Sequence, residues 1–303
     1  MAICILNCRQ RPENTGPMGV HMETHDKFVT VAPAKLNINL DVSGRTIDGY
    51  HPIRSIMQAI EGRGLGDPVR LHVLGKPGKY GNVMVDCTED TITIAACRRL
   101  EEESGKSLPA LITIEKSIPI GVGLGGGSSD AAAALRLLNV AFDLGYTVEQ
   151  LAFMSQPIGN DVPFLVYGGR ASVSMAGKEI GNIIRLLPKN LYYVVCLDSA
   201  TGPFSTEIMY RLLDEQRRDW KTEKPLESND FASLVFRLAP SSRSLLEILR
   251  KEGNAVESGV TGKGPAVFAG YGSYEEASAV KAAVRQLAGQ EVRVRSARSS
   301  DAF

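Results

Sequence analysis

A glycine-rich stretch constrains this chain more than any other part of its sequence. Residues 114–138 read IEKSIPIGVGLGGGSSDAAAALRLL, a strand-like run, then a segment in which five of seven residues are glycine, then an alanine-rich helix. Glycine lets the backbone adopt positive φ and approach a ligand closely. The first N–H groups of the following helix are unpaired, and the helix dipole adds positive charge there. The stretch therefore predicts a phosphate site that needs no lysine in the loop itself.

Three common phosphate motifs fit this stretch poorly. A Walker A loop requires Lys and then Ser or Thr after its last glycine, whereas here Ser128 and Ser129 follow Gly127. Residues 121–126 match GxGxxG, but a dinucleotide-binding unit needs a second strand about 20 residues further on. Residues 147–150 there read instead as a capping box that opens a helix. A protein-kinase glycine loop lies between two strands, whereas this one leads into a helix.

Length and charge limit the classes of partner. The 303 residues suffice for one large domain or two ordinary ones. Lys plus Arg and Asp plus Glu are 34 each, so no net field favours nucleic acid or an anionic membrane. The five cysteines include no CxxC pair, which favours free thiols in a reducing cytosol, and no apolar run approaches the length of a membrane span. We expect a cytoplasmic monomer or homodimer with small-molecule partners, no nucleic acid and no membrane.

Residues 27–42 predict strands that carry a lysine. The segment KFVTVAPAKLNINLDV reads as two short strands broken at Pro33. Alternation places Lys35 and Asn37 on the same face, which by itself fits a solvated surface. Elsewhere, apolar patterning predicts strands over 69–74, 111–115, 194–198 and 291–294, and helices over 91–104, 147–155 and 273–289.

Several segments, taken in order, resemble the motifs of the GHMP kinases, small-molecule kinases typified by galactokinase, homoserine kinase and mevalonate kinase. They are APAKLN at 32–37, the glycine loop with its GGGSSDAA ending, GNDVP at 159–163 and SGVTGKGPAVFA at 258–269. The resemblance spans about residues 27–297. It implies an α+β fold, the GHMP-kinase fold, with two lobes and the active site in the cleft between them. We expect a flexible tail over 1–26, an N-terminal ATP-binding domain over 27–170 and a C-terminal domain over 171–303.

The resemblance also assigns catalytic roles to two residues. Lys35 corresponds to a lysine that sits near the reacting hydroxyl, and Asp161 to an aspartate that acts as the base. Asn160 stands where the family commonly has Ala. Taken without the family, Asp161 fits a helix N-cap or a turn equally well. In the implied mechanism, Asp161 accepts the hydroxyl proton and Lys35 keeps the carboxylate ionised.

The glycine loop is expected to bind ATP with Mg²⁺. The residues implied are Pro119, Gly121, Gly123, Leu124, Gly125, Gly126, Gly127, Ser128 and Ser129. Ser129 is also expected to help carry the Mg²⁺ ion. In the segment at 258–269, Lys263 stands where the family usually has a small or polar residue, and from sequence alone it could contact phosphate or merely be exposed.

A further segment points to the acceptor. Residues 45–58, RTIDGYHPIRSIMQ, resemble the GRRxDGYHxLxSxFQ pattern of the 4-diphosphocytidyl-2-C-methyl-D-erythritol kinases. There the tyrosine and histidine hold the cytosine, and an aromatic face and an imidazole suit a pyrimidine. The substrate-binding residues so implied are Asn37, Tyr50, His51, Thr206 and Tyr210. Without the family, the Tyr-His pair fits surface or packing, and Tyr210 fits the core.

The implied reaction is ATP-dependent phosphorylation of the 2-hydroxyl of 4-diphosphocytidyl-2-C-methyl-D-erythritol, in the non-mevalonate route to isoprenoids. Two alternatives stay open on sequence grounds. One is another GHMP kinase of the homoserine or mevalonate type, and the other is a paralogue that binds nucleotide without catalysis. The DGYH segment argues against the first, and the presence of both Lys35 and Asp161 argues against the second.

Overall fold

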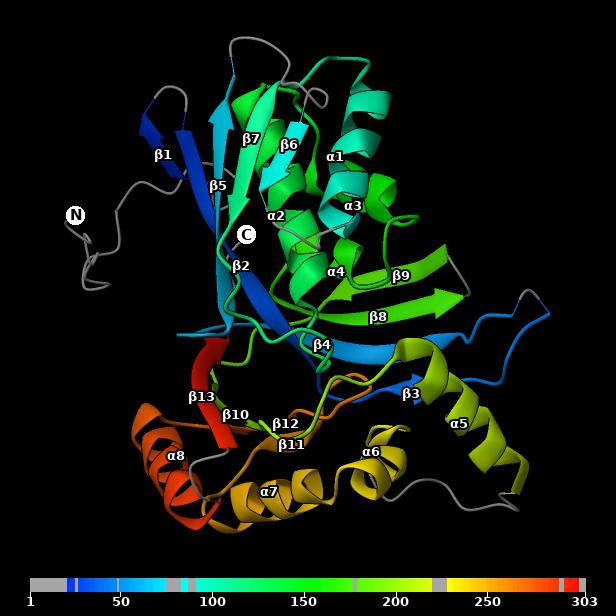
Figure 1. The fold of residues 1–303 in the computed structure, drawn as a ribbon, viewed down its shortest axis with the longest axis vertical. Coiled ribbons are helices and arrows are strands. Elements are labelled where there is room, and N and C mark those ends of the chain that lie inside the picture. Colours follow the sequence, from blue (N-terminus) through cyan, green and yellow to red (C-terminus); the bar gives the residue numbers. More distant parts are fainter. Residues whose placement is uncertain are drawn as a thin grey trace.

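The structure is a computed structural model that describes residues 21–24, 27–47, 49–74, 83–86, 91–176, 179–219, 228–288 and 292–299. Two groups of helices lie at opposite ends of the molecule, with strands between them (Figure 1). The first group is α1 (Thr91–Ser104), α2 (Gly126–Ala141), α3 (Val148–Ser155) and α4 (Val162–Tyr167). The second is α5 (Thr206–Asp219), α6 (Ala232–Leu238), α7 (Pro240–Lys251) and α8 (Tyr274–Ala288).

The strands form one continuous sheet that contacts both groups of helices. They are β1 (His21–Thr24), β2 (Lys27–Asn37), β3 (Asp41–Val42), β4 (Ile53–Glu61), β5 (Gly66–Val73), β6 (Val83–Asp86), β7 (Ala110–Ile114), β8 (Arg170–Ala176), β9 (Glu179–Arg185), β10 (Tyr192–Asp198), β11 (Glu257–Val260), β12 (Val267–Tyr271) and β13 (Val292–Ser299). The main path runs β11-β12-β10-β13-β4-β2-β5-β7-β6. The mixture of a largely antiparallel sheet with helices confirms the α+β class.

The two parts of the sheet meet at a short contact between β13 and β4. Only Arg298 with Glu61 and Ser299 with Ile60 are paired there among the described residues. The expected domain boundary at 170/171 stays a prediction, and β8 and β9, which follow it, belong to the sheet around β4.

The predicted break at Pro33 is wrong, because β2 continues through the proline as one strand. Its first half pairs with β5 as far as Pro33, opposite Gly66, and its second half pairs with β4 from Ala34 onward. Proline lacks the N–H that a central ladder needs, so it is tolerated where the strand changes partner. The change of partner carries Lys35 into the middle of the molecule.

Most other predicted elements are confirmed. The 91–104 helix is α1, and the capping box of α3 forms, with the Gln150 N–H donating to Thr147 Oγ1 at 3.3 Å. The last strand is longer than predicted, since β13 continues to Ser299. Within the expected tail, His21–Thr24 form β1 beside β2, so that segment is not a loose tail, while residues 1–20 lie outside the described part.

Helix α2 is buried on all sides along most of its length. Its four consecutive alanines from Ala131 to Ala134 are fully buried, and small side chains let the helix lie close to its neighbours. Because α2 is enclosed by protein, its N-terminus, where the glycine loop ends, has a fixed position.

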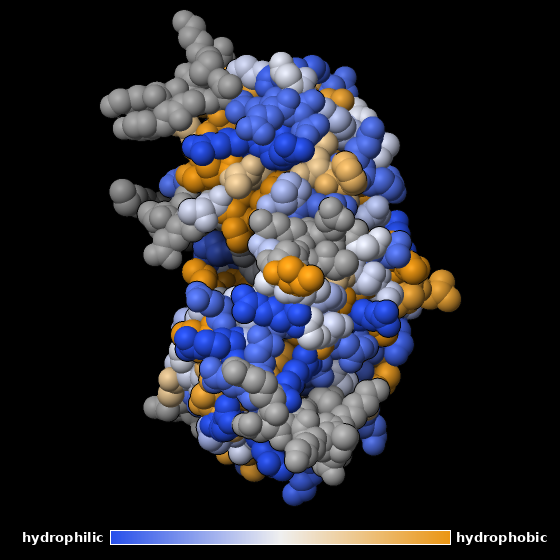
Figure 2. All heavy atoms as spheres, turned by 90° about the vertical axis from the view of Figure 1, so that its right-hand side faces the viewer, coloured by the Kyte–Doolittle hydropathy of each residue, from blue (hydrophilic) through white to orange (hydrophobic). Residues whose placement is uncertain are grey.

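No helix in the described residues is both long and apolar enough to cross a bilayer. Figure 2 shows hydrophilic side chains over much of one face, with apolar ones in separate groups. Of the five cysteines, Cys97 and Cys196 lie in the described part, where both are buried and neither forms a disulfide.

Candidate active site

The glycine loop turns sharply between β7 and α2. Gly121, Gly123 and Gly125 have φ of 73°, 92° and 72°, the left-handed region that favours glycine. Helix α2 begins at Gly126, so Ser128 lies in its first turn. The first-turn N–H groups at the end of this loop form the arrangement that binds anions at helix N-termini.

The loop is anchored by apolar side chains and by close backbone contacts. Val122 and Leu124 are 4% and 2% exposed and pack in a core with Ile118 and Phe268. A Cβ atom on Gly123 would lie 2.1 Å from the carbonyl oxygen of Thr261, so no side chain fits there. The Leu124 side chain is thus part of the core, and the Leu124 carbonyl accepts a hydrogen bond from the Lys35 backbone N–H at 3.0 Å.

The structure brings together Lys35 and Asp161, although they are far apart in the sequence. Lys35 Nζ lies 3.3 Å from Asp161 Oδ2, with the lysine side chain 4% and the aspartate side chain 25% exposed. Asp161 is the N-cap residue of α4, yet its side chain makes no capping hydrogen bond. A Cβ atom on Gly125 would lie 2.8 Å from Lys35 Cγ, so the loop packs directly on the pair. Lys35 is thus no part of a solvated strand face.

The glycine-rich segment at 258–269 joins the same cluster. The Asn37 N–H donates to Thr261 Oγ1, which in turn donates to the carbonyl of Gly123, each at 3.1 Å. The Asn37 side chain accepts from Lys35 Nζ at 2.5 Å and donates to Ser55 Oγ at 2.8 Å. Asn37, expected to bind substrate, therefore lies buried and holds Lys35 in place.

Ser129 lies deeper than its expected role in metal binding requires. Its hydroxyl is fully buried and donates to the carbonyl of Pro33 at 2.6 Å. Ser128 is half-buried on the loop side. Among the residues that the structure describes, no group of three or more His, Cys, Asp or Glu could hold a metal ion.

Lys116 is a site residue that the sequence analysis missed. Its ammonium bonds to Asp67 and Asp130, both with fully buried side chains. Burial by itself lowers the pKa of Lys116, but the bonds to and charges of Asp130 and Asp67 outweigh it and raise that pKa. A Cβ atom on Gly126 would lie 3.4 Å from Lys116 Nζ. A lysine thus lies against the start of α2, although none is in the loop, and no local pattern marked it.

The residues expected to hold a base also come together. The rings of His51 and Tyr210 lie 4.9 Å apart, and Phe231 meets Tyr210 edge-on at 5.0 Å. His51 Nε2 is 2.8 Å from Asp214 Oδ1, a partner on α5 that no sequence motif indicated. Burial and, to a lesser degree, the charge of Asp161 raise the pKa of Tyr210 to about 12, so Asp161 lies within electrostatic reach of these aromatic rings.

Tyr50 and Thr206 are the more open members of the expected substrate site. Tyr50 is 37% exposed, and Thr206 is exposed at the start of α5. The Thr206 hydroxyl accepts a hydrogen bond from Lys263 Nζ at 2.7 Å. Asp48 of the DGYH segment lies outside the described residues.

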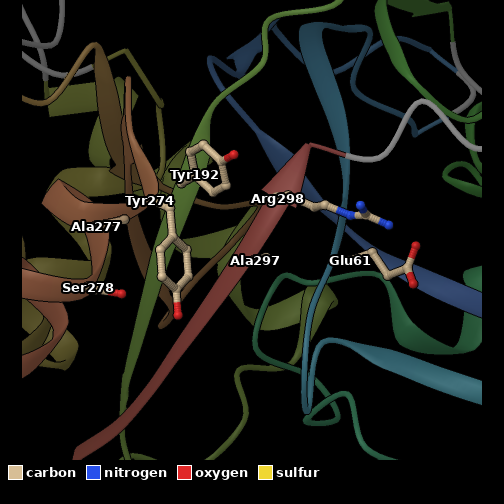
Figure 3. A pocket seen from close by; sticks show the side chains of 7 residues that line it. All are labelled: Glu61, Tyr192, Tyr274, Ala277, Ser278, Ala297 and Arg298. Atoms are coloured by element: carbon tan, nitrogen blue, oxygen red, sulfur yellow. The ribbon is translucent and has the colours of Figure 1, made fainter. Parts of the chain in front are cut away.

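A separate pocket shares no residue with this cluster. It has a volume of about 190 Å³ and lies beside α8, β10 and β13. Figure 3 shows Tyr192 and Tyr274 side by side in it, with Arg298 and Glu61 on neighbouring strands. The two tyrosine rings meet edge-on with centroids 5.9 Å apart.

The fold, the glycine loop and the Lys-Asp pair define a class. The model of the GHMP kinases N terminal domain matches residues 91–169, and the model of the GHMP kinases C terminal matches residues 209–289, together more than half of the chain. This chain belongs to the GHMP kinases.

The names of its curated relatives indicate one kind of kinase within this family. The chain is 41% identical over 160 residues to proteins named 4-diphosphocytidyl-2-C-methyl-D-erythritol kinase from Bacillus cereus (strain AH187) and Bacillus anthracis. The match covers 52% of this chain and 54% of those proteins, so it spans about half the length of the relatives.

Solved structures share the fold over nearly the whole chain. A crystal structure of 4-(cytidine 5'-diphospho)-2C-methyl-D-erythritol kinase has a TM-score of 0.71 at 24% identity, covering 90% of this chain and 100% of that one. Homoserine kinase from Cytophaga hutchinsonii has a TM-score of 0.61 at 17% identity, covering 93% of this chain and 98% of that one.

Proposed function

We propose that this chain is an ATP-dependent kinase that phosphorylates the 2-hydroxyl of 4-diphosphocytidyl-2-C-methyl-D-erythritol. Membership of the GHMP kinases and the names of the relatives support this assignment. The observation that carries it is the Lys35–Asp161 pair at 3.3 Å, packed against Gly125 at the end of the glycine loop.

In this proposal the glycine loop holds the nucleotide phosphates. The N–H groups from Gly125 to Ser128 surround the N-terminus of α2, where the dipole favours negative charge. Because the loop is fixed by buried Val122 and Leu124, the amides are already oriented before ATP binds. Lys116 lies against the start of the helix, where its charge is balanced by Asp67 and Asp130.

Asp161 then acts as the general base. Its carboxylate is partly exposed and makes no capping bond, so one oxygen is available to the acceptor hydroxyl. Lys35 stabilises the carboxylate and the developing alkoxide by its positive charge. Phosphoryl transfer depends mainly on such positioning and electrostatics.

The acceptor's cytosine would lie in the aromatic corner formed by His51, Tyr210 and Phe231, with exposed Tyr50 as the residue expected to close over it. Stacking on tyrosine tolerates any base, so selection for cytosine rests on the hydrogen bonds of His51. Asp214 fixes the orientation of that ring through Nε2.

Mg²⁺ would be held mainly by the nucleotide. This ion usually keeps several waters and binds through phosphate oxygens with one or two protein ligands. Half-buried Ser128 suits that role better than buried Ser129.

The test is a comparison of acceptors. The purified chain is incubated with ATP, Mg²⁺ and either the cytidyl substrate, homoserine or mevalonate, and phosphorylated product is measured by mass spectrometry. We expect product from the cytidyl substrate at a kcat/KM far above the other two. Product from homoserine or mevalonate alone would contradict the assignment.

A further inference from the structure

Lys263 is a half-buried lysine with no role in the proposed reaction as described so far. It lies in the glycine-rich segment at 258–269, and its ammonium donates to the Thr206 hydroxyl at 2.7 Å and to the carbonyl of Phe204. Both acceptors are neutral, and no ion pair within the described residues joins Lys263 to a carboxylate. An ammonium carries three N–H donors, so one remains after these two bonds.

A second cation lies within electrostatic reach. Burial and the charge of Lys35 lower the pKa of Lys263. Asp161 is paired with Lys35, and no carboxylate is among the groups that shift the pKa of Lys263. A partly buried cation without a counter-ion is unfavourable, so this corner of the site would be stabilised by an anion.

The surrounding contacts place Lys263 between the nucleotide loop and the acceptor side. The preceding residue, Gly262, packs on the loop, since a Cβ atom on it would lie 3.1 Å from Gly123 Cα. The Phe204 N–H donates to the carbonyl of Gly121 at 3.3 Å. Lys263 therefore joins two segments that both contact the glycine loop.

We propose that Lys263 donates its remaining N–H to the terminal phosphoryl group of the bound nucleotide, as a second cation beside Lys35. This inference rests on the proposed function, because it requires a nucleotide in the glycine loop. It makes Lys263 a phosphate-binding residue of this chain, with Phe204 and Thr206 orienting its ammonium.

The experiment measures nucleotide affinity by isothermal titration calorimetry with ADP and with a non-hydrolysable ATP analogue. Lys263→Met keeps the side-chain length and removes the charge. We expect it to weaken the analogue by about 10- to 100-fold, the range for a hydrogen bond to a charged group, and to leave ADP within about 2-fold. Lys263→Arg keeps a charged donor and should restore most of the affinity for the analogue.

Lys251→Met is the matched control, because Lys251 is exposed at the end of α7 and its loss changes net charge equally. It should bind both nucleotides as the unaltered chain does. Unchanged affinity of Lys263→Met for the analogue would overturn the inference. So would an equal loss for ADP and the analogue, or a raised KM for the acceptor alone, which would make Lys263 only a tether for the 204–206 turn. If Lys263→Met fails to fold, Lys263→Gln takes its place.

The same titrations separate this inference from the proposed function. If the unaltered chain binds the analogue through Lys263 but phosphorylates none of the acceptors, the proposed reaction fails and the phosphate contact stands. If it phosphorylates the cytidyl substrate and Lys263→Met binds the analogue normally, only the inference fails.

Discussion

At the scale of single residues, the site depends on charges that are held in place by buried neighbours. Lys35 is almost fully buried, and its ammonium is shared between the carboxylate of Asp161 and the amide oxygen of Asn37. Asp161 keeps partial access to solvent, and therefore to a substrate. This asymmetry suits a lysine that stabilises charge and an aspartate that exchanges a proton.

Replacing His51 tests the base-binding corner. His51→Ala removes the ring that packs on Tyr210 and bonds to Asp214, while leaving the glycine loop untouched. Loss of a buried, oriented hydrogen bond predicts a rise of about 10- to 100-fold in KM for the cytidyl substrate, with KM for ATP within about 2-fold. Steady-state kinetics with each substrate varied in turn provide the measurement. Equal weakening of both substrates would remove His51 from the base site.

At the scale of elements, the loop and the buried helix α2 act as one unit. The loop's glycines are required for two separate reasons, positive φ and close contact with Thr261. Both reasons apply at Gly123, whereas at Gly145, where φ is 74°, an added Cβ would meet nothing within 4 Å.

Gly123→Ala and Gly145→Ala therefore form a matched pair. Each introduces a Cβ at positive φ, which costs about 1–2 kcal/mol in the free energy of unfolding. Gly123→Ala also forces a contact with backbone and should lower stability further and reduce affinity for the ATP analogue by at least about 10-fold. Denaturant unfolding and calorimetry measure the two effects. Equal behaviour of the two variants would mean that the contact with Thr261 is unimportant.

Strands β8, β10 and β11 are joined by a buried ion pair. Arg170 bonds to both carboxylate oxygens of Glu257 at 2.9 Å, and the Tyr193 hydroxyl donates to the same carboxylate at 2.6 Å. Burial raises the pKa of Glu257, but the bonds from Arg170 and Tyr193 outweigh it, so the pKa ends below its usual value. Its stabilising effect is therefore present above the unfolded pKa of 4.5 and is lost as pH falls below it.

Glu257→Gln should expose this dependence. The variant leaves Arg170 buried without its counter-ion and is expected to lose about 3–5 kcal/mol in the free energy of unfolding at neutral pH. Because Gln does not titrate, the difference between the two proteins should shrink as pH falls below 4.5. Urea unfolding from pH 7 to pH 3 measures it. A difference that stays constant with pH would show that the charge of Glu257 is not responsible.

At the scale of the whole molecule, the residues of the candidate site come from strands, helices and turns on both sides of the contact between β13 and β4. Sequence patterns predicted the glycine loop and, through family resemblance, Lys35 and Asp161, because those residues lie in short motifs. Lys116 and Asp214 were missed, since their partners come from distant segments that no local pattern identifies. For the same reason the continuation of β2 through Pro33 could not be predicted, because it depends on the change from β5 to β4. The cytoplasmic location and the oligomeric state stay predictions.

We expect the carboxylate beside Lys35 to take the acceptor's proton. This expectation is tested most directly by single-turnover phosphorylation of the cytidyl substrate with Asp161→Asn, at saturating ATP and with nucleotide binding measured in parallel. We expect the rate to fall by about 10²- to 10⁴-fold, the range for loss of a general base, while affinity for the ATP analogue changes by less than about 3-fold. A rate for Asp161→Asn within a few-fold of the unaltered chain would contradict it.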